Sequence, residues 1–362
     1  MTAAKAPHPG STLDDELLPI NLDAVEAAAR RIAPHVHRTP VLRSRLLDGR
    51  TGARVLLKAE CLQRTGSFKA RGAFNAVLAG AERGDGRGII ALSSGNHAQA
   101  VALAAATAGL AATVVMPGDA SALKRAATRA YGAAVISEEV DAANREAMAQ
   151  AVARERGLRL VHHFDDPEVM AGQGTVALEL LEQAAASGVG LDAILVPVGG
   201  GGLLSGVATA VRALAPGVRI IGVEPARADD AARSLATGRR QRLAAAPDTI
   251  ADGVRTLSLG ERPWAVIRRL VDAIVTVDED AIATACWWLW TRAKLVVEPT
   301  GALPLAALLA AADGAHPAGP LAALLPPSPT VGCVLSGGNV DPLQLATLLR
   351  RPPDAGAAPP PG

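Results

Sequence analysis

The sequence predicts an α/β fold in which two open, mostly parallel sheets are covered by helices. Short apolar runs of strand length alternate with alanine-rich segments of helical length, and polar turns containing glycine follow several of these runs. At 362 residues, of which 49% are hydrophobic and 20% charged, the chain is long enough for two domains. The strand-like runs are residues 53–58, 88–92, 112–116, 133–137, 159–162, 193–197, 218–223, 273–277 and 330–335.

Four turns rich in small residues are candidates for ligand binding. Residues 65–72 (TGSFKARG) contain Lys69, and a partly desolvated lysine is suited to form an imine with a carbonyl. Residues 93–99 (SSGNHAQ) and 197–206 (PVGGGGLLSG) each follow a strand-like run and open a helix, while 336–339 (SGGN) follow the last run. Ligands of open α/β sheets lie beyond the carboxyl ends of strands, so these turns predict one shared crevice. The N–H groups of the glycine run suit a phosphate.

These four segments, in this order and at these separations, resemble the fold-type II pyridoxal 5′-phosphate (PLP) enzymes, which share a tryptophan synthase β-like fold. Within that group they resemble the branch of serine/threonine dehydratases and serine racemases. The resemblance runs from about residue 21 to about residue 349 and includes residues 250–254 (IADGV) and 298–301 (EPTG). It implies PLP as cofactor, an amino acid as substrate, and a homodimer.

The resemblance implies roles for the matching residues around PLP. Lys69 holds the cofactor as an imine and removes the α-proton of the substrate, Phe68 shields the ring, and Asn96 binds the pyridoxal 3′-oxygen. Ser336 faces the pyridine nitrogen. Because a hydroxyl is a poor acid, Ser336 leaves the ring a weaker electron sink, which suits prompt loss of a β-hydroxyl and disfavours transamination. The phosphate is assigned to the backbone amides of Gly199, Gly200, Gly201 and Gly202.

The same resemblance assigns the substrate carboxylate to Thr65, Ser93, Ser94 and His97. Ser94 has two interpretations. In serine racemases a serine at this position handles the proton on the face opposite the lysine, which makes Ser94 a second catalytic candidate. Alternatively, Ser94 only binds the carboxylate.

The implied activity is deamination of L-threonine or L-serine to a 2-oxo acid and ammonia, in which Lys69 is both anchor and base. Alternatives within the branch are serine racemisation and dehydration of a related β-hydroxy amino acid such as 3-hydroxyaspartate. In this last case Arg145 favours a substrate with an acidic side chain. Alternatively, Arg145 is an arginine on a helix surface. An alternative of a different functional class is a PLP carrier that has no catalytic activity. Such a carrier needs no substrate loop, whereas this chain has one.

Residues 222–230 (GVEPARADD) resemble the divalent-cation loop of the same branch. The resemblance assigns Mg²⁺, or else Ca²⁺ or Mn²⁺, to the carboxylates of Glu224 and Asp230 and the carbonyl of Ala228, an all-oxygen set. A solvated acidic turn is the alternative. Residues Arg292, Lys294 and Asn339 match positions near a nucleotide effector in the racemases, and a solvated helix end explains the two basic residues equally well.

The domain prediction is a large PLP-binding domain, residues 19–87 and 162–350, interrupted by a small domain, residues 88–161, that closes over substrate. Residues 1–18 and 351–362 are polar or rich in proline, alanine and glycine, and are expected to be disordered. Because the segment after Asn339 is short, no appended regulatory domain is expected, and a catabolic role is the expectation.

The composition excludes several other classes. A net charge of +1 argues against nucleic-acid or membrane-surface partners, and no apolar stretch of membrane-spanning length or signal-peptide core is found, so a cytoplasmic location is expected. The three cysteines are too dispersed for a zinc site and predict buried thiols. The cluster His162-His163-Phe164-Asp165-Asp166 precedes Pro167, so one of the aspartates is expected to cap a helix there.

Overall fold

The computed structural model describes residues 18–349, apart from 86, 94, 119–121, 139, 141–143 and 315–318. The expected disordered ends, residues 1–18 and 351–362, lie outside the described residues except for Leu18. The strands are β1 (Val41–Leu42), β2 (Arg54–Lys58), β3 (Ile89–Leu92), β4 (Ala112–Val115), β5 (Ala134–Ile136), β6 (Arg159–Leu160), β7 (Ala193–Pro197), β8 (Arg219–Pro225), β9 (Ala273–Val277) and β10 (Thr330–Val334).

Helices connect these strands. The α-helices are α1 (Leu22–Ile32), α2 (Arg45–Thr51), α3 (Lys69–Glu82), α4 (Asn96–Thr107), α5 (Ala122–Ala130), α6 (Arg145–Arg156), α7 (Pro167–Ala186), α8 (Gly202–Leu214), α9 (Asp230–Thr237), α10 (Glu261–Leu270), α11 (Glu279–Thr291), α12 (Pro299–Ala312), α13 (Gly319–Leu324) and α14 (Pro342–Leu349). Short 3-10 turns are η1 (Glu60–Leu62), η2 (Arg64–Gly66) and η3 (Asp252–Val254).

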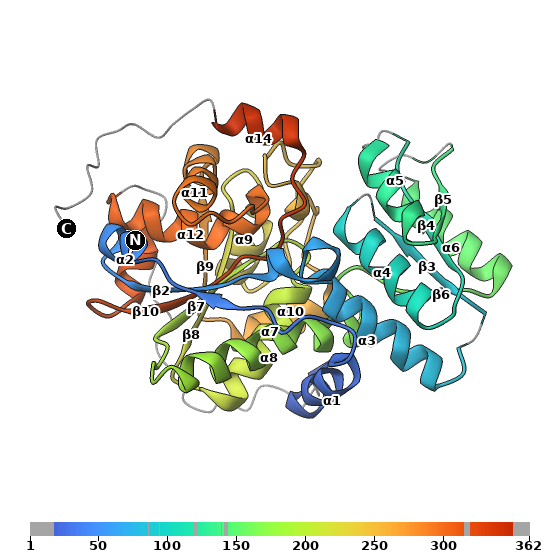
Figure 1. Ribbon diagram of the computed structural model, residues 1–362, viewed down its shortest axis with the longest axis horizontal. Coiled ribbons are helices and arrows are strands. Elements are labelled where there is room, and N and C mark those ends of the chain that lie inside the picture. The colour runs from blue at the N-terminus through green and yellow to red at the C-terminus, as the bar shows by residue number, and fades with distance from the viewer. Residues whose placement is uncertain are drawn as a thin grey trace.

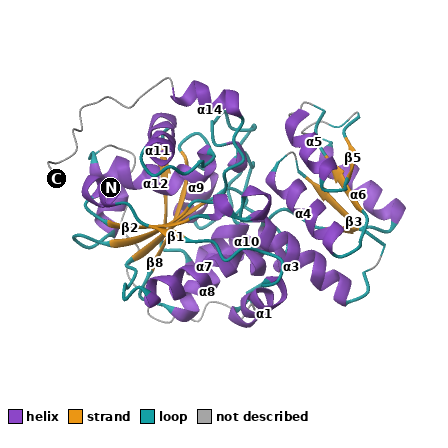
Figure 2. Ribbon diagram, in the orientation of Figure 1, coloured by secondary structure: helices purple, strands orange, loops and turns teal. Residues whose placement is uncertain are grey.

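Two sheets organise the chain, as predicted (Figures 1 and 2). The larger has the order β1-β2-β10-β7-β8-β9 and the smaller the order β5-β4-β3-β6. All pairs are parallel except the antiparallel pair of β1 and β2. Each predicted strand-like run contains a strand. Only β1 was not predicted, because two residues show no hydrophobic period.

Helices cover both faces of the larger sheet, with α11 and α12 on one side and α7 and α8 on the other (Figure 1). Alternation along β7 explains this: Leu195 belongs to the core under α11 and α12, whereas Ile194 and Val196 belong to the core under α7 and α8. The smaller sheet lies apart, between α4, α5 and α6 in Figure 1. The boundaries of the two predicted domains stay a prediction.

Three further expectations concern the described residues. Asp166 is the N-cap of α7 and accepts hydrogen bonds from the N–H groups of Glu168 and Val169, which confirms the predicted cap. The cysteines are free and buried, also as predicted. Within the described ranges, no helix combines the length and the apolarity that crossing a membrane requires.

Candidate functional site

Lys69 is the first residue of α3 and is held from two sides. The N–H of Phe68 donates to the carbonyl of Ser336 at 3.0 Å, and Ser67 pairs with Gly337 in an isolated bridge. The Nζ of Lys69 donates to the carbonyl of His163 at 2.8 Å. Burial lowers the pKa of Lys69 to about 8, against the opposing charge of Glu298. A fraction of this amine is therefore unprotonated near neutral pH and is nucleophilic.

Phe68 and Ser336 lie beside this amine. Lys69 Nζ is 5.0 Å from the centre of the Phe68 ring. Ser336 is 1% exposed, and its backbone carbonyl is used by Phe68 while its Oγ has no partner among the described residues. The hydroxyl is thus available to a ligand, which is the arrangement that the assignment of Ser336 requires.

Asn96, the first residue of α4, is fixed by two residues that the sequence reasoning did not assign to PLP. Its Nδ2 donates to Glu298 Oε1 at 2.8 Å, and its Oδ1 accepts from Asn339 Nδ2 at 2.8 Å. Asn339 Nδ2 also donates to the carbonyl of Thr65 at 2.7 Å. One N–H of the Asn96 amide remains for a ligand. The sequence signal for Glu298 was its place in the EPTG segment, and for Asn339 its place in the SGGN segment and its match to a position near a nucleotide effector.

The glycine run Gly199 to Gly202 lies between the end of β7 and the start of α8. Gly201 has φ +91°, which favours glycine, and a Cβ on Gly200 would overlap the ring of Phe164. None of the four backbone N–H groups donates to another described residue. Together with the N-terminus of α8 they form a cradle for an anion such as phosphate.

The predicted substrate residues are partly brought together. Thr65 has φ 57° and a buried Oγ1 without a partner among the described residues, and Ser93 Oγ accepts from the Gly95 N–H at 3.1 Å. Ser94 lies outside the described residues. His97 is 2% exposed, and burial, with a contribution from the Lys69 charge, lowers its pKa to about 3. At neutral pH its imidazole is therefore uncharged.

The hydrogen bond of His97 determines what the ring can offer. Its Nε2 lies 3.0 Å from the carbonyl of Val161, and a carbonyl only accepts, so Nε2 carries the proton and Nδ1 is an acceptor. The buried Nδ1 has no partner in the described part of the chain. The ring cannot donate to a carboxylate in this state. The donor at this position is the backbone N–H of His97 in the first turn of α4.

His163 also belongs to this site, although the sequence reasoning interpreted its cluster as helix capping. Its ring lies 6.1 Å from the ring of His97, and its Nδ1 is buried with no partner among the described residues. Burial lowers the pKa of His163 well below its usual value, and the charges of Lys69 and Arg145 add to this shift. The sequence signal was its position at the carboxyl end of β6, next to β3 in the smaller sheet.

The site therefore fits a ligand with the chemistry of PLP. Buried polar atoms without a partner are costly, yet several surround Lys69. Among the described residues these atoms are Thr65 Oγ1, Ser67 Oγ, His97 Nδ1, His163 Nδ1 and Ser336 Oγ. An amine, an unused phosphate cradle and these orphaned groups match an aldehyde, a phosphate and a polar ring.

The predicted cation residues lie at the end of β8 and the start of α9. Glu224 accepts from the N–H groups of Ala231 at 3.3 Å and Ala232 at 2.7 Å, and Asp230 Oδ2 is buried without a partner among the described residues. Burial raises the pKa of Glu224 well above its usual value and that of Asp230 to about 7. No group of three or more His, Cys, Asp or Glu side chains able to hold a metal occurs in the described ranges.

Comparison with known proteins identifies the family. The family described as "Pyridoxal-phosphate dependent enzyme" matches residues 32–326. This chain belongs to that family. It is 45% identical over 322 residues to the L-threo-3-hydroxyaspartate ammonia-lyase of Saccharomyces cerevisiae, covering 89% of this chain and 94% of the relative. It is 42% identical over 325 residues to the serine racemase of Homo sapiens, covering 89% and 92%.

Solved structures agree with the fold and the family. The crystal structure of a threonine deaminase from T.th. superposes with a TM-score of 0.83 and 56% identity, covering 89% of this chain and 99% of that one. The PLP-dependent enzyme described here is therefore a member of the ammonia-lyase and racemase group, which confirms the predicted family and fold class.

Proposed function

We propose that this PLP-dependent enzyme is an ammonia-lyase that converts L-threonine or L-serine to a 2-oxo acid and ammonia. The observation that carries the proposal is the placement of Lys69. Its amine, with a pKa of about 8, donates to the His163 carbonyl, and the neighbouring turns carry buried polar atoms that have no partner among the described residues. The 56% identity to a threonine deaminase supports the choice of substrates.

The residues of the site have separate roles in the proposed reaction. When bound, PLP supplies an aldehyde that exchanges amines and a ring that withdraws electrons from the α-carbon. Lys69 Nζ is the group that would hold PLP and would take the α-proton of the substrate as a base. Ser336 Oγ is the group that would face the ring nitrogen, and because a hydroxyl is no strong acid, the site favours prompt departure of the β-hydroxyl. His97 and His163 stay neutral and add no competing positive charge beside Lys69.

Backbone groups orient the substrate. The N–H groups at the start of α4, including that of His97, are assigned the substrate carboxylate. Thr65 Oγ1 is buried without a hydrogen-bond partner among the described residues and would supply one more hydrogen bond. The glycine cradle, Gly199 to Gly202, is assigned the phosphate, and Asn96 Nδ2 the pyridoxal 3′-oxygen. Together these contacts would hold the α-proton within reach of Lys69.

A second candidate substrate is 3-hydroxyaspartate, and one residue favours it. Arg145 is the first residue of α6, is half-buried, and lies close enough to His163 for its charge to lower the pKa of that ring. Its guanidinium makes no hydrogen bond or ion pair with another described residue. A guanidinium near His163 that has no partner in the described ranges suits a second carboxylate on the substrate. The yeast relative is named for this substrate.

Three finer predictions accompany the proposal. Ser94 as second proton carrier, and with it serine racemisation, stays a prediction. A divalent cation on Glu224, Asp230 and the Ala228 carbonyl would offset the cost of burying two carboxylates. The homodimer and the cytoplasmic location also stay predictions.

The test compares the wild-type protein with Lys69→Ala. The purified proteins are incubated with PLP, and the imine absorbance and the formation of 2-oxobutanoate from L-threonine are followed. We expect both signals in the wild type and neither in the variant. Imine absorbance in Lys69→Ala would show that another lysine holds PLP, and 2-oxobutanoate formation by this variant would remove Lys69 as the base.

A further inference from the structure

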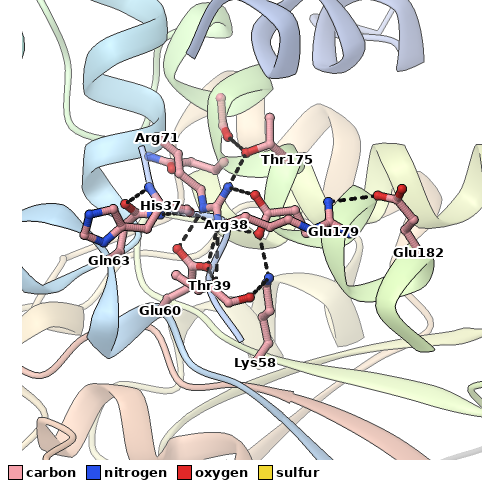
Figure 3. A network of polar contacts seen from close by, with 12 residues as sticks. His37, Arg38, Thr39, Lys58, Glu60, Gln63, Arg71, Thr175, Glu179 and Glu182 are labelled. Atoms are coloured by element: carbon pink, nitrogen blue, oxygen red, sulfur yellow. Dashed lines mark hydrogen bonds and ion pairs between the residues drawn. The ribbon is translucent and has the colours of Figure 1, made fainter. Parts of the chain in front are cut away.

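Four charged side chains are buried together around Arg71, which lies two residues after Lys69 in the sequence (Figure 3). Lys58 comes from β2, Glu60 from η1, Arg71 from α3 and Glu179 from α7. The side chains of Lys58, Glu60 and Arg71 are 0% exposed and that of Glu179 is 14% exposed. Two cations and two anions make the group neutral. We call these four residues the charge cluster.

Arg71 is the centre of the charge cluster and holds both carboxylates with two hydrogen bonds each. Its Nε and Nη2 donate to Glu60 Oε2 and Oε1, both at 2.8 Å. Its Nη1 and Nη2 donate to Glu179 Oε1 at 2.7 Å and Oε2 at 2.8 Å. A planar guanidinium bound on two edges cannot rotate or slide, so the first turn of α3 is fixed in position and orientation.

Lys58 closes the charge cluster from the sheet side. Its three donors are all used, by the Thr39 carbonyl at 2.8 Å, Glu179 Oε2 at 2.6 Å and Gln183 Oε1 at 2.9 Å. The polar network is therefore largely satisfied, which is the condition under which a buried network specifies one geometry. Figure 3 shows Arg71 and Lys58 converging on Glu179 from different elements.

The charge cluster reaches both halves of the site. Arg71 lies two residues after Lys69, so the two side chains project from opposite sides of α3. Arg71 Nη2 also donates to the His37 carbonyl at 3.3 Å. His37 exchanges two backbone hydrogen bonds, at 2.8 and 2.7 Å, with the side chain of Gln63, the N-cap of η2. That short turn carries Thr65.

We propose that the charge cluster is a positioning device, which fixes Lys69 and the Thr65 turn relative to PLP and substrate. Burying ion pairs often contributes little stability compared with apolar packing, so their contribution here is geometric. Arg71 and Glu179 are positioning residues that act through Lys69. The effect on PLP attachment rests on the family, and the effect on turnover rests on the proposed function.

The test uses Glu179→Gln, which keeps the shape of the side chain and removes its charge. Two matched variants lie on the same helix. Glu182→Gln alters an exposed ion pair with Arg38, drawn in Figure 3, and Leu180→Ala creates a cavity in the core without touching the charge cluster. The measurements are the melting temperature, the rate of imine formation when PLP is added to the cofactor-free protein, and kcat and KM on L-threonine.

For Glu179→Gln we expect imine formation and kcat to fall about tenfold while KM changes less than about threefold. Leu180→Ala lowers the melting temperature but keeps the rate of imine formation within about twofold of wild type, because a core cavity does not move Lys69. Glu182→Gln changes neither quantity. If Glu179→Gln, like Leu180→Ala, lowered only the melting temperature, the role of the charge cluster would be structural. The proposal would then be overturned.

Arg71→Lys provides the second variant, since it keeps the charge of the cluster but not the two-edged binding. We expect the same slow imine formation, and a wild-type rate in this variant would also contradict the proposal. Imine formation needs no substrate. The variants could form the imine slowly while the wild type shows no activity on any β-hydroxy amino acid. That result would support the positioning role of the charge cluster and would reject only the proposed function.

Discussion

The amine of Lys69 donates a hydrogen bond to the carbonyl of His163 at 2.8 Å, across the 94 residues that include the whole smaller sheet. This contact joins the start of α3 to the segment that follows β6 of the smaller sheet. It also keeps the amine in a buried place, where burial lowers the pKa of Lys69 to about 8.

The lowered pKa predicts how the cofactor-free protein captures PLP. Only the unprotonated amine attacks an aldehyde, so the rate of imine formation rises with pH. We expect a midpoint at about 8, well below the ordinary lysine value of 10.5. Stopped-flow absorbance at several pH values measures it. A midpoint near 10.5 would mean that Lys69 is solvated in the cofactor-free protein.

The second prediction concerns the phosphate cradle. Gly200→Ala places a methyl group against the ring of Phe164 and must displace the glycine run. We expect the Kd of PLP to rise about fivefold or more, since overpacking costs about 1 kcal/mol or more. Gly190→Ala is the control, because its added Cβ meets no atom within 4 Å. Equal PLP affinity in the two variants, measured by fluorescence titration, would argue against this cradle.

The third prediction separates the candidate substrates. Arg145→Gln removes the charge proposed to bind a second carboxylate, so kcat/KM on 3-hydroxyaspartate is expected to fall about 10- to 100-fold. On L-serine, which has no such group, kcat/KM changes less than about threefold. Arg154→Gln, an exposed residue of the same helix, serves as the control. Equal losses on both substrates would assign Arg145 another role.

The fourth prediction concerns the cation residues and pH. Burial raises the pKa of Asp230 from 3.8 to about 7, so the folded state favours its protonated form. The resulting stabilisation is complete below pH 3.8 and is lost as pH rises through about 7. A cation binds the ionised form, so Mg²⁺ is expected to raise the melting temperature by roughly 5 °C at pH 8 and little at pH 5.

Asp230→Asn should abolish both the Mg²⁺ effect and this part of the pH dependence, which is obtained as the difference between wild type and variant. Asp248→Asn is the matched control, because Asp248 is 96% exposed and pairs only with exposed Arg227 among the described residues. A melting temperature that does not respond to Mg²⁺ at pH 8 would support the alternative of an acidic turn without a cation.

Local pattern was sufficient to predict the fold. Apolar runs between glycine turns located the strands from β2 to β10, since each buried parallel strand is a short continuous apolar stretch. The motif segments likewise located Lys69, Asn96 and Ser336, because each lies directly after a strand or in the turn of its own motif.

Contacts between distant segments were not predictable in this way. Glu298 contacts Asn96, 202 residues away in the sequence, and His163 contacts Lys69, 94 residues away. No local sequence pattern predicts such pairs. The state of His97 was also missed, because its neutral charge and acceptor Nδ1 follow from burial and from the Val161 carbonyl. The charge cluster around Arg71 depends in the same way on four separate elements.

The most direct measurement is product analysis after incubation of the PLP-loaded protein with L-serine. Pyruvate, ammonia and D-serine are quantified in the same sample, with Lys69→Ala beside it. The ammonia-lyase account predicts pyruvate and ammonia in equal amounts, both exceeding D-serine, and no product from the variant. D-serine without pyruvate would make the enzyme a racemase and contradict the account.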